Sequence, residues 1–235
     1  NGYNNSSPQF TSLPVPYICE NEPFNYNHGA FDADGDSLVF SMVAAQDGPY
    51  PGTNITYNLP ASPTYPIVDN NGFNTFDSQT GALSVNPDGS DDLAVMTILV
   101  EEYRNGVLIG STMRDIQVVI QACTNVQPQS DILGMINQVG GVSIDSNSIE
   151  VCPGEALSFQ LTYTDGNPGD DVALLTNLAI VMPGATFTTV GTNPVTASFS
   201  WTPTALDAGF HNFIVTVQDD GCPILGSQVF SYDIL

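Results

Sequence analysis

The chain consists mainly of short segments in which apolar residues alternate with polar ones. A period of two is typical of a β-strand with one buried face, and the 3.6-residue period of an amphipathic helix is weak throughout. Gly, Pro, Asn and Asp separate the segments, as in turns. The pattern predicts an all-β protein. The clearest strand candidates are residues 37–43 (SLVFSMV), 93–103 (LAVMTILVEEY), 107–120 (VLIGSTMRDIQVVI), 156–163 (ALSFQLTY), 210–218 (FHNFIVTVQ) and 227–235 (SQVFSYDIL).

Two of these segments are joined by a strong turn signal. Asn105 and Gly106 follow residues 93–103 closely and precede residues 107–120. An Asn-Gly pair favours a tight hairpin turn because both residues tolerate positive φ angles. The sequence therefore predicts a β-hairpin here.

The strand pattern occurs twice along the chain. Thirteen positions separate Cys19 from Asp32, and thirteen separate Cys152 from Asp165. A domain-sized repeat of short strands predicts two tandem antiparallel β-sandwich domains. We place the boundary in the polar, linker-like stretch 124–130. Domain 1–124 then carries an acidic DADGD turn and a long Pro/Tyr/Asn-rich loop, and domain 125–235 is truncated at its C-terminal end.

The charge balance is strongly acidic. The chain has 25 Asp and Glu against 2 Lys and Arg, a formal net charge of −23. Such a surface cannot neutralise phosphates, so nucleic acid and anionic membranes are excluded as partners. No apolar run reaches the length of a membrane span, which argues against direct membrane insertion. The charge suits multivalent cations or a salty extracellular medium, where solubility alone would explain it.

The stretch FDADGDSLVF places Asp32, Asp34 and Asp36 on alternate positions of one turn. Carboxylates are preferred ligands of Ca²⁺, which takes six to eight oxygen atoms. An EF-hand is excluded, because Val43 stands where that loop needs a bidentate Glu. In a β-sandwich, a loop between the last two strands lies at the same end as this turn. The sequence therefore predicts that Glu101 and Glu102 complete a calcium site; the alternative is a solvated turn.

A second, less regular acidic group lies in the other repeat. Its aspartate order is broken by Pro168 and Gly169. We predict a second calcium site built from Asp165, Asn167, Asp170 and Asp171, facing Asp219 and Asp220.

Four widely spaced cysteines fit an oxidising compartment better than a zinc site, since none forms a C-x-x-C pair. Cys19 is expected at the start of the second strand and Cys123 just past the last strand, at the same end of a sandwich. This predicts a Cys19–Cys123 disulfide. Cys152–Cys222 is the remaining pairing within a domain, with two free thiols as the alternative.

Catalysis is not favoured by the sequence. There is no G-x-S-x-G or H-E-x-x-H motif, no Lys, and each acidic cluster falls in a turn signal. Loops at sandwich ends often carry function. Three tyrosines of the long loop are therefore candidate carbohydrate contacts, namely Tyr50, Tyr57 and Tyr65.

Four stretches resemble one class of repeat. DADGDSLVF, YRNGVLIGSTMRDIQVVI, CPGEALSFQLTYTDG and FSWTPTALDAGFHNFIVTVQDDGCPI are similar to the tandem Ig-like/cadherin-like repeats of very large Bacteroidota cell-surface proteins, including gliding-motility adhesins exported by type IX secretion. The resemblance covers nearly the whole chain and is specific to the repeat class.

The resemblance implies a non-enzymatic module of a surface adhesin or filament, stiffened by calcium and serving adhesion or gliding motility. It implies an extracellular location at the cell surface, after secretion across the outer membrane. Implied partners are neighbouring repeats of the same chain, and surface glycans or other surface proteins. The implied calcium ligands are Asp32, Asp34 and Asp36, with Glu101 or Glu102. The alternative is a calcium-dependent carbohydrate-binding module.

Overall fold

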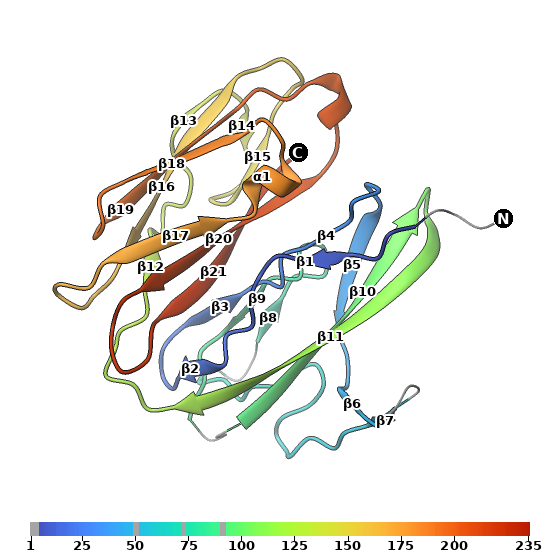
Figure 1. Ribbon diagram of the computed structural model, residues 1–235, viewed down its shortest axis with the longest axis vertical. Coiled ribbons are helices and arrows are strands. Elements are labelled where there is room, and N and C mark those ends of the chain that lie inside the picture. Colours follow the sequence, from blue (N-terminus) through green and yellow to red (C-terminus); the bar gives the residue numbers. More distant parts are fainter. Residues whose placement is uncertain (1–4, 49–51, 72–73, 90–92) are drawn as a thin grey trace. The chain divides into compact units, whose positions relative to one another are not determined.

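Strands occupy the segments in which polar and apolar residues alternate, and they separate into two units (Figure 1). The computed structural model describes residues 5–48, 52–71, 74–89 and 93–235. Unit 1 comprises residues 1–124 and unit 2 comprises residues 125–235. In the described part of the chain, helix is confined to α1 (Leu178–Val181) and η1 (Ala205–Asp207). No helix there is long and apolar enough to cross a membrane.

Unit 1 is built around a four-stranded sheet with the order β2-β11-β10-β5. A three-stranded sheet, β3-β9-β8, and the two-stranded pairs β1-β4 and β6-β7 accompany it. All pairs are antiparallel except β2 with β11. The strands are β1 (Gln9–Phe10), β2 (Tyr17–Cys19), β3 (Phe24–Tyr26), β4 (Ala30–Phe31), β5 (Ser37–Met42), β6 (Gln46–Asp47), β7 (Thr53–Asn54), β8 (Thr75–Phe76), β9 (Leu83–Val85), β10 (Leu93–Arg104) and β11 (Val107–Gln121).

The longest hairpin of unit 1 joins β10 to β11. Asn105 and Gly106 form its turn with φ angles of 53° and 75°, so the prediction from the Asn-Gly pair is confirmed. On one face of this hairpin Ile98 and Val100 pack against Phe40 of β5. Strand alternation thus places apolar side chains of the two paired strands β10 and β5 in one core.

Unit 2 consists of two five-stranded sheets. One has the order β12-β16-β19-β18, with β13 also paired to β16, and the other has the order β14-β15-β21-β20-β17. The β15–β21 pair is parallel and the others are antiparallel. The strands are β12 (Gln129–Ser130), β13 (Ile136–Val139), β14 (Val142–Ser143), β15 (Ser148–Glu150), β16 (Leu157–Thr164), β17 (Val172–Thr176), β18 (Thr186–Val190), β19 (Val195–Trp201), β20 (His211–Asp219) and β21 (Ser227–Ile234).

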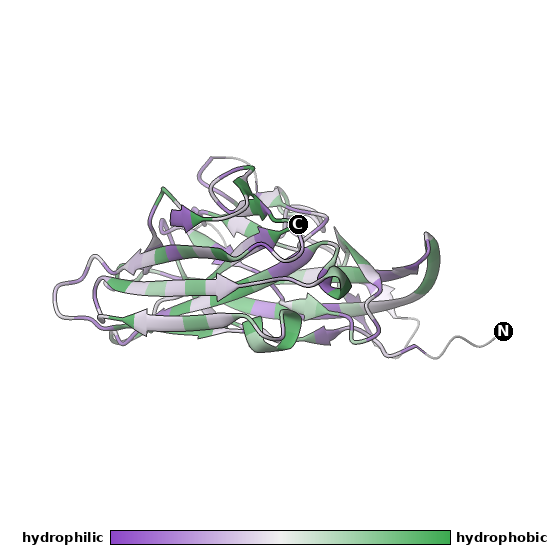
Figure 2. Cartoon of the chain, turned by 90° about the horizontal axis from the view of Figure 1, so that it is seen from above, coloured by the Kyte–Doolittle hydropathy of each residue, from purple (hydrophilic) through white to green (hydrophobic). Residues whose placement is uncertain are grey.

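An aromatic core holds the sheets of unit 2 together. The rings of Phe159 and Phe199 stack with centroids 4.4 Å apart, and Phe213 lies 5.5 Å from Phe199. Trp201 is only 5% exposed at the end of the same core. Figure 2 shows the resulting alternation of hydrophobic and hydrophilic residues along the strands. The predicted fold class, two tandem antiparallel β-sandwiches, is therefore confirmed.

Unit 1 contains the disulfide expected between Cys19 and Cys123, with Cα atoms 5.4 Å apart. Cys19 ends β2, whose parallel pairing places it opposite Gln121, two residues before Cys123. The pairing of these strands at one end of the unit brings the two thiols together.

The prediction of a Cys152–Cys222 disulfide was wrong: both cysteines are free and exposed. Cys152 follows β15, which pairs with the end of β21, whereas Cys222 precedes the start of β21. At about 3.4 Å per residue, an eight-residue strand separates its two ends by roughly 25 Å. A disulfide requires Cα atoms within about 7 Å of each other.

Candidate metal centres

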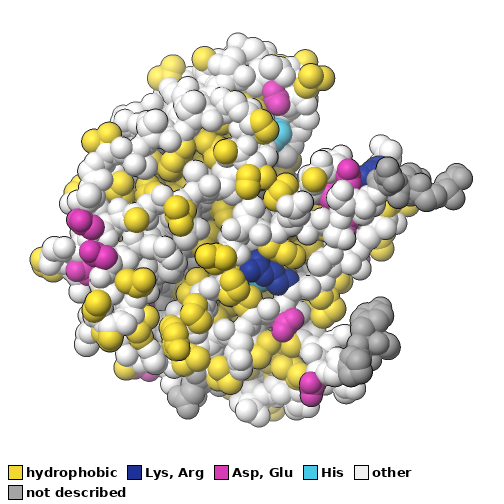
Figure 3. Space-filling model, in the orientation of Figure 1, with side chains coloured by type: hydrophobic (Ala, Val, Ile, Leu, Met, Phe, Trp, Pro, Cys, Tyr) yellow, Lys and Arg dark blue, Asp and Glu magenta, His cyan; other side chains and the backbone are white. Residues whose placement is uncertain are grey.

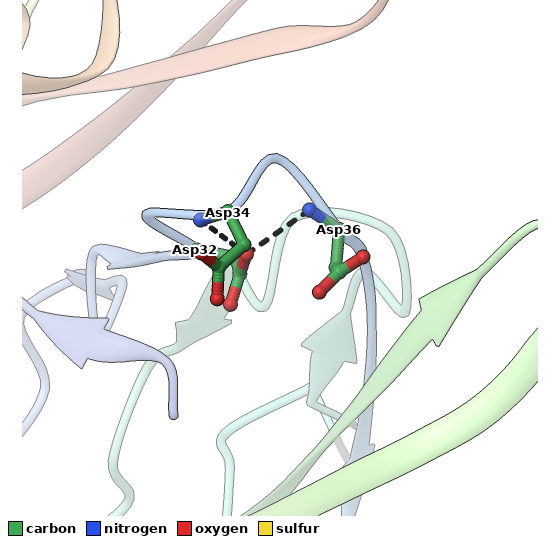
Figure 4. A group of neighbouring side chains, drawn as sticks. All are labelled: Asp32, Asp34 and Asp36. Atoms are coloured by element: carbon green, nitrogen blue, oxygen red, sulfur yellow. Dashed lines mark hydrogen bonds between the residues drawn. The ribbon is translucent and has the colours of Figure 1, made fainter. Parts of the chain in front are cut away.

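The acidic turn of unit 1 connects β4 to β5, and its three aspartates converge (Figure 4). One carboxylate oxygen of each of Asp32, Asp34 and Asp36 lies within 4.8 Å of the others. Asp32 Oδ1 accepts the backbone N–H groups of Asp34, at 2.8 Å, and Asp36, at 3.0 Å. Gly35 has a φ angle of 80°, which a residue with a side chain adopts only with strain. The turn therefore holds its carboxylates on one side.

A guanidinium group already neutralises part of this cluster. Arg104, the last residue of β10, donates from Nε and Nη2 to the two oxygens of Asp36, each at 2.6 Å. Its Nη2 also lies 3.8 Å from Asp34 Oδ2 and 3.4 Å from Asn5 Oδ1. The hydrogen bond from Arg104 lowers the pKa of Asp36. The bidentate pairing makes Arg104 an internal cation of the turn.

Glu101 and Glu102 are not members of this carboxylate group. Neighbouring residues on a strand point to opposite faces, so the two cannot both face the turn. Glu102 is 1% exposed and accepts a hydrogen bond from the Asn5 amide, while Glu101 accepts one from the Tyr103 hydroxyl. The predicted five-carboxylate site is therefore corrected to three aspartates with Arg104.

In unit 2, the loop between β16 and β17 carries the second acidic group. Asp165 Oδ1 accepts the N–H of Asn167 at 2.7 Å, the same local bond that Asp32 makes to Asp34. The Asn193 amide donates to the carbonyl oxygens of Asp165 and Asp170, at 3.2 and 3.1 Å. Asn193, which the sequence analysis did not identify, thus anchors this loop.

Asp219 is the buried acid of unit 2. It ends β20, is 5% exposed, and its Oδ1 accepts the N–H groups of Gly221 and Gly226. Burial, followed by the charges of Asp219 and Asp170, raises the pKa of Asp165. Of the predicted second set, the structure therefore brings Asp165 and Asp219 into interaction. Among the described residues, the group of three carboxylates that converges within 4.8 Å is that of unit 1.

The remaining predicted ligands of unit 2 lie at its periphery. Asp220 Oδ1 accepts the N–H of Asp171 at 2.8 Å, and both residues are exposed. Asn167 Oδ1 accepts the N–H of Val126 at 2.8 Å. These bonds tie neighbouring loops together and leave Asp165 and Asp219 as the charged pair.

The two units share a feature that the sequence analysis missed. In unit 1 the Asn5 amide donates to Glu102; in unit 2 the Asn125 amide donates to Asp219 Oδ2, at 2.9 Å. Likewise, the N–H of Ser6 donates to Asp34 at 2.6 Å, as that of Val126 does to Asn167. In each unit an N-terminal segment therefore bonds to an acid on a strand and to a polar side chain of a loop.

The sequence signal for this segment is a repeated N-x-x-P-Q motif, Asn5 to Gln9 and Asn125 to Gln129. We had interpreted residues 124–130 as a polar linker. In the structure Asn125 and Gln127 are buried within unit 2, at 4% and 6% exposure. Comparing the two repeats from these asparagines onward would have identified the motif.

The candidate tyrosines of the long loop use their hydroxyl groups within unit 1. Tyr57 accepts the N–H of Ala45 and donates to the carbonyl of Val95, and Tyr65 bonds to both backbone groups of Asp69. Tyr50 lies outside the described residues.

The two centres fit a hard divalent cation to different degrees. Both offer oxygen ligands, which suit Ca²⁺ and Mg²⁺ rather than a soft metal. In unit 1 Arg104 occupies both oxygens of Asp36. Each centre holds one buried carboxylate oxygen without a hydrogen-bond partner, Asp32 Oδ2 in unit 1 and Asp165 Oδ2 in unit 2, and in unit 2 the buried Asn125 Oδ1 also lacks one. Unit 1 already has a guanidinium group beside its acids and unit 2 has neither Lys nor Arg, so a cation would neutralise more in unit 2.

No protein-family model and no curated protein matches the chain. Similar solved structures include human protocadherin-24 EC1-2 (14% identity, TM-score 0.31, 98% of each chain covered). A second is protocadherin gamma B7 cadherin domains 1–4, with 14% identity and a TM-score of 0.29; the match covers 98% of this chain and 50% of that one. A third is an endo-fucoidan hydrolase of glycoside hydrolase family 107, with 17% identity and a TM-score of 0.27; the match covers 97% of this chain and 28% of that one. The chain thus spans half or less of the latter two. Similarity at this level carries no inference about ligand or activity.

Proposed function

We propose that the chain is a non-enzymatic, calcium-stiffened tandem module of a larger adhesin or filament at the cell surface. In this proposal each unit is an Ig-like/cadherin-like repeat, and calcium holds the acidic loops of a unit together. Surface adhesion or gliding motility, an extracellular location after type IX secretion, and contacts with neighbouring repeats and surface glycans or proteins follow from the sequence resemblance.

The observation that carries the calcium proposal is the matching position of the two acidic centres. In both units an N-terminal asparagine donates to an acid on the first strand of a late hairpin, Glu102 or Asp219. The N–H of the next residue donates to a side chain in the loop after an earlier strand, Asp34 or Asn167. The chain has only two Lys and Arg residues to balance its carboxylates, and its net charge is −23. On the face in Figure 3 acidic side chains recur, and basic ones are sparse. Divalent cations would relieve this repulsion.

Hydrogen bonding within the chain argues against catalysis. A pocket of about 210 Å³ in unit 2 is lined by Cys152, His211 and Asp207, residue types that a thiol enzyme could use. However, a ring nitrogen of His211, Nε2, lies 2.7 Å from the backbone carbonyl of Asp207, and its ring packs edge-on against Trp201. The His211 ring is therefore held by structural contacts.

The alternative of a carbohydrate-binding module gains no specific support. The Tyr57 and Tyr65 hydroxyls bond to backbone groups of their own unit, which is the arrangement of packing residues.

A thermal melt in chelator and in excess calcium tests the proposal. A ligand at a hundred times its Kd adds about 2.7 kcal/mol to the free energy of unfolding. Trp201, the single tryptophan, reports unit 2, and far-UV circular dichroism reports both units. We expect calcium to raise the melting temperature, with Mg²⁺ at the same ionic strength as the control. Coincident melts would refute a calcium-stiffened module.

A further inference from the structure

We propose that unit 2 binds one calcium ion tightly between Asn125, Asp165 and Asp219, and that this ion takes the role that the Arg104 guanidinium has in unit 1. The inference rests on the proposed calcium-binding function and says where the ion binds. It adds a ligand, Asn125, and assigns the two units different cations.

The first evidence is the state of the Asn125 side chain. It is 4% exposed, and its Nδ2 donates to Asp219 Oδ2 at 2.9 Å and to the carbonyl of Ile224 at 3.1 Å. Two acceptors fix which end of the amide carries the nitrogen, because a flipped amide would set oxygen against oxygen. Its Oδ1 is therefore a true acceptor, and it is buried without a partner. A buried acceptor without a partner is destabilising, and a cation would relieve it.

The second evidence is the carboxylate pair. Asp219 Oδ1 accepts two backbone N–H groups and its Oδ2 accepts the Asn125 amide, whereas Asp165 Oδ2 is buried without a partner. Asp165 and Asp219 interact through their side chains. Asp219 is buried and Asp165 is partly buried, and two adjacent carboxylates repel each other unless a proton or a cation lies between them.

The third evidence is the matching place in unit 1. There, Asn5 makes the bond to Glu102 that Asn125 makes to Asp219. The Oδ1 of Asn5, however, has a cationic neighbour, because Arg104 Nη2 lies 3.4 Å from it. Arg104 follows Glu102 by two positions, and the residue two positions after Asp219 is Gly221. A Cβ atom at Gly221 would lie 2.4 Å from Asn125 Oδ1, so no side chain can enter there without displacing the amide.

No side chain of unit 2 can supply the missing positive charge as Lys or Arg. Both arginines of the chain belong to unit 1, and the chain has no lysine. The ligands are all oxygen atoms, from one amide and two carboxylates, and such a mixed set suits the flexible coordination of Ca²⁺ better than the strict octahedron of Mg²⁺. In unit 1 calcium must displace the bidentate Arg104, so we infer weaker binding there.

Calorimetric titration of the whole chain with calcium tests the inference. We expect one tight site in the wild type, no tight site in Asp219→Asn, and about tenfold weaker binding in Asn125→Ala, because the latter removes one neutral ligand. Asn5→Ala is the matched control, since it removes the same bond from unit 1, and it should leave the tight site intact. Trp201 fluorescence shows whether unit 2 of each variant is folded.

Arg104→Gln provides a second, independent test, because this substitution changes unit 1 and leaves unit 2 unchanged. Removing the guanidinium frees Asp36 and Asn5 Oδ1, and we expect a second tight calcium site to appear. The inference is overturned if folded Asn125→Ala binds like the wild type, or if Arg104→Gln leaves one site. If Asp34→Asn rather than Asp219→Asn removes the tight site, calcium binding stands and the inference falls. If the wild type binds no calcium, the inference and the proposed calcium-binding function are both refuted.

Discussion

The acidic ends of the two units share a plan but differ in their source of positive charge. Unit 1 places Arg104 on Asp36 and near Asn5, and it also closes a disulfide between Cys19 and Cys123. Unit 2 has neither Lys nor Arg, and its two cysteines are free. Each acidic end has one aspartate oxygen buried without a partner, of Asp32 or of Asp165, and unit 2 adds the Oδ1 of Asn125.

The difference shows that a regular acidic motif is not by itself the better metal site. The DADGD turn of unit 1 has the more regular spacing, yet Arg104 binds both oxygens of Asp36. The broken motif of unit 2 leaves acceptors available. What matters for a cation is the set of oxygens that the folded chain leaves unpaired. We therefore expect the stability of unit 1 to depend on its disulfide and on Arg104. The stability of unit 2 should depend on cations bound from solution.

The largest expected effect separates the units by redox chemistry. Opening the Cys19–Cys123 bridge, which closes a loop spanning 104 positions, should lower the stability of unit 1 by about 4 kcal/mol by the chain-entropy argument. We expect the Cys19→Ser/Cys123→Ser variant, or added reductant, to lower the unit 1 transition in circular dichroism. The Trp201 transition of unit 2 should not move.

The control for this comparison is Cys152→Ser/Cys222→Ser, which removes two exposed thiols and should leave both transitions in place. An equal downward shift of the Trp201 transition in the unit 1 variant would contradict the independence of the two units.

The second effect is an acid sensitivity of unit 1 that arises from His28. Burial, and then the charge of Arg114, lower the pKa of His28 to about 3 from 6.5. Below pH 6.5 the unfolded chain takes up a proton that folded unit 1 refuses, so stability is lost as the pH falls towards 3. From pH 7 to pH 4 this amounts to about 3 kcal/mol.

His28→Phe should remove this part of the acid sensitivity. The His28 ring packs edge-on against Phe10 and Tyr26, and its Nδ1 has no partner, so a phenyl ring suits the site. Denaturant melts at pH 7 and pH 4 measure the difference between variant and wild type. Equal acid losses in both proteins would show that His28 titrates normally.

The smallest effect concerns the Arg104–Asp36 pair itself. Arg104→Gln should lower the melting temperature of unit 1 slightly at low ionic strength in chelator. The loss should shrink at about 1 M salt, because ions screen partly exposed charges. Arg104→Lys keeps the charge without the bidentate geometry, so its melting temperature should lie between those of the wild type and Arg104→Gln. A loss that is equal at both salt concentrations would mean that Arg104 acts through packing.

Much of the fold could be predicted because it depends on local chemistry. The alternation in residues 93–103 and 107–120 and the Asn105-Gly106 turn predicted the β10–β11 hairpin. The turn at Asp32 was also visible, since one side chain bonds to the next few backbone N–H groups. Such features involve neighbours in sequence.

The partners of the acids could not be predicted in this way. Asp36 and Arg104 are 68 positions apart, and Asn125 and Asp219 are 94 apart. The two units divide within the stretch 124–130, but polar composition alone did not show that Asn125 and Gln127 are buried there. The Cys152–Cys222 prediction failed because the two residues lie near opposite ends of the eight-residue strand β21.

By itself, the sequence determined the strands, the hairpin turn, the double repeat and the excess of negative charge. Only the tertiary structure decided which groups lie against the acids of each unit. The reason is that strand pattern and turn chemistry depend on residues a few positions apart. Charge neutralisation instead depends on which distant side chains the sheets bring within hydrogen-bonding distance, as with Arg104 at Asp36 and Asn125 at Asp219.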